Sequence, residues 1–341
     1  MTAVPPAILA VDGGNSKADV ALVAADGTLL AAVRGPTVSH QAVGLEAGLD
    51  ALDASVVRAL EQAGLDPSGR PVAGRGIYAL AGADLPSDVR LLERGLRGRG
   101  LTDELVVLND TRAALRAGSD RPWGVAVICG AGTNGLGVGP SGRVVRFAAV
   151  GEYSGDRGAG GGMAIEALAA AIRGRDGRGP RTSLEKLVPD AFGRKRPGDL
   201  TADLELGRLG REQLRERLPP IVFAAAADGD LVAGALVDDV ADEIVAWAVA
   251  MIRRLHLTRR DVPVVLSGGI IRTSYAPFHD RIRTRIQAVA PAARIVPLTA
   301  PPVVGAALLG LDRLELSAGE RSAAETRLRA TLTIERLGVA R

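Results

Sequence analysis

The sequence contains one cysteine, Cys129, among 341 residues. A single cysteine excludes a disulfide framework, an all-cysteine zinc site and a cysteine-held iron–sulfur cluster within one chain. This usage is typical of a reducing compartment, so we expect a cytoplasmic protein. Aromatic residues make up only 3% of the chain, which leaves few rings on which nucleic-acid bases could stack. We therefore interpret the basic pI near 9.4 as a solvated arginine surface and expect no nucleic-acid partner.

The sequence also lacks a long apolar run without charges. The longest helical candidate, residues 231–255, carries four carboxylates and is amphipathic. A membrane-spanning helix needs about 20 predominantly apolar residues. The short apolar run before Asp12 has neither a charged leader nor a cleavage site after it. We therefore expect no membrane partner and no export signal.

Hydrophobic residues (47%) and glycine (43 residues) are abundant, which predicts well-filled cores joined by tight turns. The length predicts two domains, which we place at residues 1–118 and 119–341, the second with a helical insertion at about 160–257. Both begin with three strands and continue with alternating helices and strands. The predicted strands are residues 7–11, 19–24, 28–33, 76–80, 105–108 and 124–129, a strand that follows GAGTNG and ends at residue 138, and residues 143–147, 262–266 and 293–296.

The openings of the two predicted domains resemble each other. Residues 12–35 read DGGNSKADVALVAADGTLLAAVRG, and residues 129–151 read CGAGTNGLGVGPSGRVVRFAAVG. In each, a strand ends in a turn of small residues, and a strand, a glycine turn and a third strand follow. This similarity indicates an internal duplication.

The first of these turns has the residue types of a phosphate site. Gly13 and Gly14 lack Cβ atoms and allow backbone amides to approach an anion, and Ser16 and Lys17 add a hydroxyl and a positive charge. Asp12 would repel phosphate unless a cation such as Mg²⁺ lay between them. An ordinary hairpin turn explains the same residues equally well. The similar second turn, residues 130–134, favours phosphate binding by both.

Four further candidates have a structural alternative. Asp110 ends a buried strand, where α/β sheets place ligands, but it or a neighbour could cap the following helix. Asp156, among six glycines, could bind substrate hydroxyls or cap the next helix. His40 is predicted on a loop, where it could contact substrate or be merely exposed. The pair Gly268-Gly269 could approach a nucleoside or form an ordinary turn from strand to helix.

The ordered motifs DGGNSKAD, ND before a helix, GAGTN, SGG and a late Gly-Ala-Ala resemble the actin-like ATPase superfamily of sugar kinases, Hsp70 and actin. Within it, the chain resembles the BadF/BadG/BcrA/BcrD ATPase family, which includes N-acetylglucosamine kinase. The resemblance covers essentially the whole chain. It implies an α/β, duplicated, ribonuclease H-like fold: two domains, each with a mixed five-stranded sheet and flanking helices, and a cleft between them.

The resemblance also implies roles for particular residues. Asp12 would hold Mg²⁺, and Asp110 would be the general base that activates a sugar hydroxyl. The residues expected to bind ATP are Gly13, Gly14, Asn15, Ser16, Lys17, Gly132, Thr133, Asn134, Gly268 and Gly269. Those expected to contact the sugar are Ser39, His40, Asp110 and Asp156.

The chain departs from the family pattern mainly around the sugar. Ser39-His40 stands where the amino-sugar kinase has Asn-His, and Gly-Asp-Arg-Gly-Ala, with no tryptophan before it, stands where that kinase has Gly-Asp-Glu-Gly-Ser. We therefore expect an ATP-dependent kinase of N-acetylglucosamine or a related hexose, with the identity of the sugar left open. The alternatives are a nucleotide-dependent conformational switch without a sugar acceptor, and a member that binds ligands without turnover. A homodimer is also left open.

Overall fold

The computed structural model describes residues 5–338, and the chain folds into two compact units. The first unit contains the chain up to Pro122 and again from Leu298, and the second contains Trp123–Pro297. The sequence-based boundary assigns everything after residue 118 to the second domain, so this boundary is corrected. The chain returns to the first unit because residues after Leu298 pack into one core with the first sheet.

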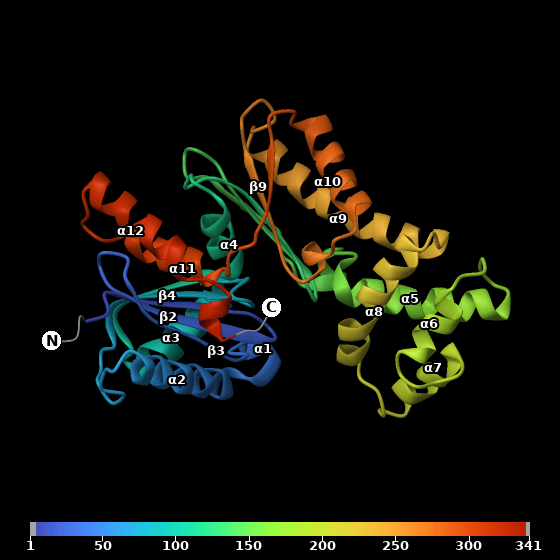
Figure 1. Cartoon of the computed structure of the whole chain (residues 1–341), viewed down its shortest axis with the longest axis horizontal. Helices are drawn as coiled ribbons and strands as arrows, with labels where there is room; N and C mark the ends of the chain where they lie inside the picture. The colour runs from blue at the N-terminus through green and yellow to red at the C-terminus, as the bar shows by residue number, and fades with distance from the viewer. Residues whose placement is uncertain (1–4, 339–341) are drawn as a thin grey trace. The chain divides into compact units, whose positions relative to one another are not determined.

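The first unit is built on a five-stranded mixed sheet of order β3-β2-β1-β4-β5 (Figure 1). Strand β1 is antiparallel to β2 and parallel to β4, which is parallel to β5. The strands are β1 Ile8–Gly13, β2 Lys17–Val23, β3 Leu29–Pro36, β4 Ala73–Leu80 and β5 Thr102–Asn109.

Helices cover both faces of this sheet because its central strands are apolar on both sides. In β1, Leu9 and Val11 pack into one core with the helices α2 and α3, whereas Ile8 and Ala10 pack into another with α11 and α12. The helices of this unit are α1 His40–Val43, α2 Leu45–Gln62, α3 Pro86–Arg99, α4 Asp110–Gly118, α11 Val303–Leu311 and α12 Ala318–Thr331, followed by the 3₁₀ turn η3 Glu335–Leu337.

The second unit repeats the same sheet order, β8-β7-β6-β9-β10. Its first three strands are again antiparallel, and β9 again pairs in parallel with the first of them. The internal duplication predicted from the two openings is thus confirmed at the level of topology. The strands are β6 Gly124–Cys129, β7 Thr133–Val138, β8 Val144–Arg146, β9 Pro263–Ser267 and β10 Arg294–Pro297.

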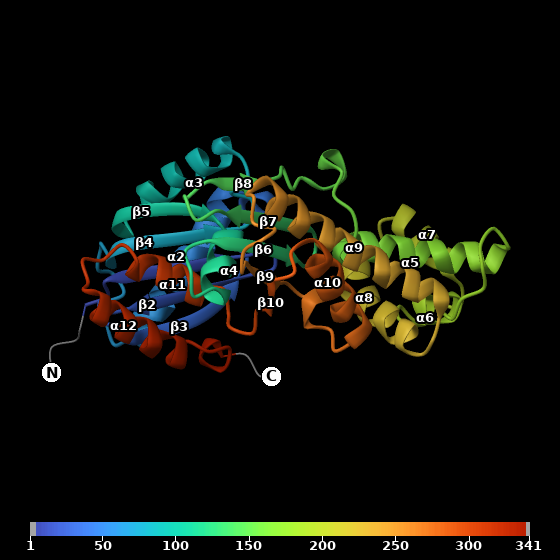
Figure 2. The ribbon, with the colours of Figure 1, turned by 90° about the horizontal axis from the view of Figure 1, so that it is seen from above.

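Five helices lie between β8 and β9, where the sequence predicts a helical insertion. The longest of them, α9, packs against β6 and β7, and α10 packs against α9 (Figure 2). The helices are α5 Ala159–Asp176, α6 Leu184–Asp190, α7 Pro197–Glu205, α8 Arg211–Ala227, α9 Leu231–Arg254 and α10 Ala276–Val289, with the 3₁₀ turns η1 Gly151–Ser154 and η2 Ile270–Arg272.

Within residues 5–338, no single helix has the length and apolar composition of a membrane span. Only α8 and α9 taken together reach that composition, and the chain bends by 116° between them.

The packing of α11 on α4 leads to a prediction about Gly305. A Cβ atom at Gly305 would overlap the carbonyl oxygen of Ala113 and the backbone of Ala117, so the two helices can approach this closely only at a glycine. We expect Gly305→Ala to destabilise the protein by about 1–3 kcal/mol, measured by urea unfolding.

The matched control is Gly98→Ala, because Gly98 is exposed near the end of α3 and a Cβ there meets nothing within 4 Å. It should be neutral or stabilise the helix by about 0.5–1 kcal/mol. Equal stability of the two variants would contradict the close approach of α4 and α11.

Candidate functional site

The carboxyl ends of three parallel strands meet at one edge of the first sheet. Gly13 of β1 pairs in register with Leu80 of β4, which pairs with Asn109 of β5. The turn that follows Gly13 and the helix that begins at Asp110 therefore lie at the same edge. Ligands of α/β sheets bind at this kind of edge.

The first turn is a tight hairpin. The Gly14 amide donates to the Lys17 carbonyl at 2.9 Å, so this amide is already used inside the turn. Asn15 and Ser16, at the tip, are exposed. Packing requires a glycine at position 13, because a Cβ there would lie 2.6 Å from side-chain atoms of Leu80 and Val38. The turn can thus offer an anion the groups of residues 15–17, while Gly13 serves packing.

Asp12 belongs to a row of charged side chains across three strands. It lies directly opposite Asp19 in β2, and Asp19 lies opposite Arg34 in β3. Asp19 is 1% exposed, and both of its oxygens accept hydrogen bonds from Arg34, at 2.6 and 2.7 Å. The sequence-based prediction did not include Asp19 or Arg34. The sequence does offer a signal for them, since both are charged residues inside otherwise apolar strands. They lie in one row with Asp12 in the register of the sheet.

The surroundings of Asp12 disfavour its ionised form. Burial raises the pKa of Asp12 well above its ordinary value of 3.8, and the carboxylates of Asp19 and Asp110 raise it further, while Lys17 and Arg34 oppose the shift. The pKa of Arg34 is raised, chiefly by its hydrogen bonds to Asp19. Asp12 and Asp110 are close enough to interact, so a positive charge between them would relieve their repulsion.

Asp110 does not cap the helix that it begins. The Asn109 side chain performs that function, because its oxygen accepts a hydrogen bond from the Thr111 amide at 3.2 Å. The Asn109 amide nitrogen in turn donates to Asp84 at 2.9 Å. Of the alternatives left open by the sequence, the cap therefore belongs to Asn109. Asp110 occupies the first helical position, where the helix dipole favours a carboxylate.

Ser39 and His40 lie at the start of α1, a single helical turn where the sequence predicted only a loop. Thr37 links this segment to the first turn, since its hydroxyl donates to the Gly14 carbonyl at 2.8 Å and accepts from the Ser39 amide at 3.1 Å. Ser39 Oγ and His40 Nδ1 are buried and have no hydrogen-bond partner within residues 5–338. Buried polar atoms without partners are rare and suit a ligand with hydroxyl groups.

The second turn, in the second unit, is one residue shorter. Three residues, 130–132, separate the paired Cys129 and Thr133, whereas four separate Gly13 from its partner Ala18. The carbonyls of Gly130 and Ala131 accept hydrogen bonds from the amides of residues 160 and 161 at the start of α5. Thr133 is buried, and its hydroxyl lies beside the Cys129 thiol, whose pKa it lowers against the larger effect of burial.

The glycine pair after β9 lies against this second turn. Gly268 has a φ of +107°, and a Cβ on it would overlap the backbone of Cys129. Gly268 is therefore required by the close approach of two backbones. A Cβ on Gly269 would meet nothing within 4 Å, so Gly269 leaves open space beside the turn.

Asp156 organises its own loop. Its Oδ2 accepts hydrogen bonds from the Gly151 amide at 2.9 Å and the Ser154 hydroxyl at 2.7 Å. Both of these groups precede α5, so these bonds do not cap that helix, and contact with a substrate stays a prediction. Tyr153, two residues before the Gly155-Asp156 pair, is 98% exposed.

The candidate residues thus form two groups, one in each unit. The first unit holds Asp12, Gly13, Gly14, Asn15, Ser16, Lys17, Ser39, His40 and Asp110, and the second unit holds Gly132, Thr133, Asn134, Asp156, Gly268 and Gly269. Among the described residues, no group of three or more His, Cys, Asp or Glu side chains is arranged to hold a metal ion.

Comparisons with known proteins agree with this fold. The family model described as the BadF/BadG/BcrA/BcrD ATPase family matches residues 9–310. The N-acetylmuramic acid/N-acetylglucosamine kinase of Clostridium acetobutylicum is 26% identical over 306 residues, which cover 89% of this chain and 97% of that protein. The N-acetyl-D-glucosamine kinase of Dictyostelium discoideum is 26% identical over 311 residues, with the same coverage of both proteins.

Solved structures show the same architecture. A candidate N-acetylglucosamine kinase from Chromobacterium violaceum has a TM-score of 0.70 at 23% identity, over 90% of this chain and 99% of that chain. A ROK family glucokinase from Streptomyces griseus has a TM-score of 0.56 at 17% identity, over 89% of this chain and 98% of that chain. These likenesses confirm the predicted actin-like ATPase fold.

The charge row predicts that Asp12 lowers the stability of the ligand-free protein. Because its pKa is raised on folding, Asp12 keeps its proton in the folded protein at pH values where the unfolded chain has lost it, so its contribution to stability falls from about pH 4 up to its raised folded pKa. Asp12→Asn removes this cost. We expect this variant to have a higher Tm at pH 7, corresponding to a gain in unfolding free energy on the order of 1 kcal/mol. The gain should shrink as the pH falls towards 4.

Asp103→Asn is the control, since Asp103 is exposed on β5. It should leave Tm unchanged at both pH values. A Tm for Asp12→Asn at or below that of the unchanged protein at pH 7 would contradict the electrostatic picture.

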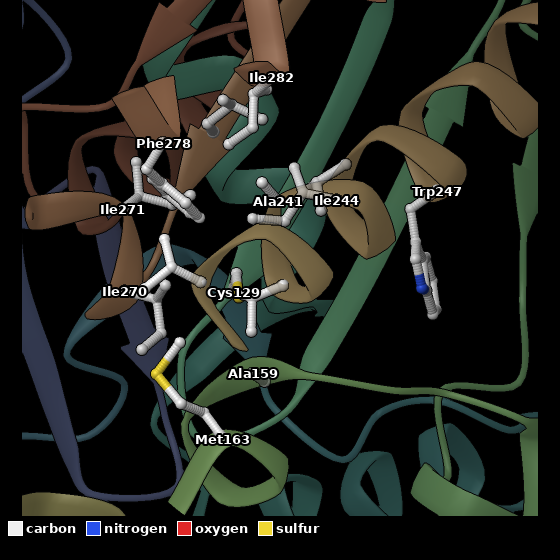
Figure 3. Packing of buried hydrophobic residues seen from close by; sticks show 14 of the residues in the cluster. Cys129, Ala159, Met163, Ala241, Ile244, Trp247, Ile270, Ile271, Phe278 and Ile282 are labelled. Atoms are coloured by element: carbon white, nitrogen blue, oxygen red, sulfur yellow. The ribbon is translucent and has the colours of Figure 1, made fainter. Parts of the chain in front are cut away.

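Cys129 provides a test of the second turn. Figure 3 shows its sulfur among the side chains of Ala159, Met163 and Ile270, and burial raises the pKa of the thiol to about 12. The thiol therefore stays protonated and inaccessible at neutral pH. We expect iodoacetamide to leave the native protein unlabelled and to label it fully in urea. Rapid labelling of the native protein would show that this turn opens.

Proposed function

The chain belongs to the BadF/BadG/BcrA/BcrD ATPase family, and we propose that it is an ATP-dependent sugar kinase whose acceptor is an amino-hexose, with N-acetylglucosamine the first candidate. The two curated relatives, both named as N-acetylglucosamine kinases, support this choice. The observation that carries it is that the turn after Asp12 and the helix that begins at Asp110 lie at the same carboxyl edge of the first sheet. A phosphate-binding turn and a proton acceptor are needed together for phosphoryl transfer to a hydroxyl.

We assign the ATP phosphates to the two turns. In the first, the exposed tip at Asn15 and Ser16 offers amides and a hydroxyl, and Lys17 adds a positive charge. Gly13 and Gly14 shape this turn. In the second, Gly132, Thr133 and Asn134 would contact the phosphates, with the Thr133 hydroxyl as a donor. Gly269 would leave room for the nucleoside, while Gly268 holds the backbone close to Cys129.

The residues of the first unit fit a magnesium ion that travels with ATP. Mg²⁺ is commonly held by one or two carboxylates together with substrate phosphates and water. Asp12 supplies a carboxyl group whose pKa is raised chiefly by burial, and Asp110 lies close enough to raise it further. When bound, Mg²⁺ would neutralise charge on the phosphates.

Asp110 is assigned as the general base. Its carboxylate accepts the proton of the sugar hydroxyl as that oxygen bonds to the γ-phosphorus, and the bond from the γ-phosphorus to the bridging oxygen breaks to release ADP. The first turn of α4 holds Asp110 in place, because Asn109 caps the helix and is itself bound to Asp84.

The acceptor sugar is assigned to Ser39 and His40. Their buried Oγ and Nδ1 atoms require partners, which the hydroxyls of a sugar can supply. The two residues are tied to the first turn through Thr37. Asp156 would contribute through its Oδ1, because Oδ2 is occupied within the loop.

A coupled assay of ADP release tests the function. N-acetylglucosamine, N-acetylmannosamine, glucosamine and glucose are compared, each with and without Mg²⁺. Release of ADP that depends on one of these sugars supports the kinase. Slow release that no sugar changes would overturn it and favour the nucleotide-dependent switch.

We predict that Asp110→Asn loses most transfer activity and keeps ATP binding. Loss of a general base typically costs on the order of 10²–10⁴ in rate. Asn keeps the size of the side chain and the helical position, so the comparison isolates the proton acceptor. Single-turnover rates and the thermal shift produced by ATP with Mg²⁺ measure the two effects.

Asp103→Asn is again the control, because it removes a carboxylate from β5, the strand that leads to Asp110. It should retain full activity. Near-normal turnover by Asp110→Asn would remove Asp110 from the proposed role.

A further inference from the structure

The helix that begins with Asp110 is held at its other end by a part of the chain about 200 residues away. Arg329 of α12 donates to the carbonyl oxygens of Ala117 at 2.6 Å and Arg116 at 3.2 Å, in the last turn of α4. A third, longer bond reaches the carbonyl of Ser119 at 3.5 Å. The last carbonyls of a helix have no partners inside the helix, and a guanidinium is well suited to bind them.

The side chain of Arg116 makes a second connection. It donates to Asp312, just after α11, at 2.9 and 3.1 Å, and to both oxygens of Glu325 in α12 at 2.9 Å. Glu325 also accepts from Arg329 at 3.0 Å. Arg116 is 11% exposed, so these are charge-assisted bonds in a largely buried site. The hydrogen bond from Arg116 lowers the pKa of Glu325, which keeps that carboxyl ionised.

Direct backbone packing makes the third connection. Gly305 lets α11 approach the backbone of α4 at Ala113, one helical turn after Asp110. Figure 2 shows α11 lying beside α4 within this unit. Together, these contacts tie the C-terminal segment (residues 298–338) to α4 from Ala113 to its last turn.

We propose that the C-terminal segment positions α4, and thereby Asp110, and that Arg329 and Glu325 are positioning residues for phosphoryl transfer. The role of Arg329 and Glu325 in phosphoryl transfer rests on the function proposed above. A helix of nine residues is marginal by itself, so its order must come from its contacts. A displacement of a reacting group by about 1 Å can cost on the order of 10² in rate.

The positions of the contacts distinguish this role from general stabilisation. Arg329 is about a third exposed, whereas Arg116 is 11% exposed, so loss of Arg329 leaves the more buried ion pairs of Arg116 in place. Two of the three groups of contacts end on the last turn of α4, where they restrict tilting and fraying of the helix. The expected effect of their loss is therefore local to α4.

The chain offers a closely matched control in the same helix. Arg327 lies two residues before Arg329, but it donates to Asp26 in the turn between β2 and β3, at 2.6 and 2.7 Å. Arg327→Ala and Arg329→Ala each remove one arginine side chain from α12. Only the second removes a contact with α4.

The experiment compares Arg329→Ala, Arg329→Lys and Glu325→Gln with Arg327→Ala by hydrogen exchange and kinetics. We expect Arg329→Ala to speed amide exchange in residues 110–118 at least about tenfold. It should lower kcat about tenfold while changing KM for ATP less than about twofold. Arg329→Lys should recover part of both losses, since an ammonium can bind one or two of the carbonyls.

Two results would overturn the proposal. One is exchange in α4 that is the same for Arg329→Ala and Arg327→Ala. The other is faster exchange in α4 with an unchanged kcat. If the unchanged protein released no ADP with any sugar, the proposed function would fail and so would the assignment to phosphoryl transfer, while the exchange data would still decide whether α12 orders α4.

Discussion

The meeting of Asp12 and Asp110 at one edge of the first sheet is the constraint on which the candidate site of the first unit depends. The two groups come from distant parts of the unit's chain, at the end of β1 and just after β5, and meet because those parallel strands end at one edge. Burial raises the pKa of Asp12, so the protein bears a cost that no residue of its own fully offsets. A cost of this kind is typical of a site that is completed by a ligand.

The rest of the first unit holds these two carboxylates in place. Arg34 neutralises Asp19, the neighbour of Asp12 on β2, so that only part of the negative charge is left uncompensated. Asn109 fixes the first turn of α4, and the C-terminal segment fixes its last turn. The sheet, the Asn109 cap and the C-terminal segment therefore all hold α4. The return of the chain to its first unit thus has a physical role, which is to hold the end of this helix.

Much of this architecture could be predicted from local patterns. The two similar openings predicted the duplicated sheet, and the glycine-rich turns after β1 and β6 lie where their sequence indicated. What could not be predicted depends on contacts distant in sequence. No local pattern tells that α11 packs against β1, that Arg34 pairs with Asp19, or that Arg329 binds the end of α4. The Gly268 motif was open to two interpretations because only the fold shows that Cys129 lies against it.

The most direct test of the shared carboxylate site is an NMR titration of the Asp12 and Asp110 side-chain carboxyl carbons in the ligand-free protein. We expect the pKa of Asp12 to lie well above the ordinary value near 3.8, and we expect Asp110→Asn to shift this titration downwards. It would be contradicted if Asp12 titrated at its ordinary value, or if the titration did not respond to the loss of Asp110.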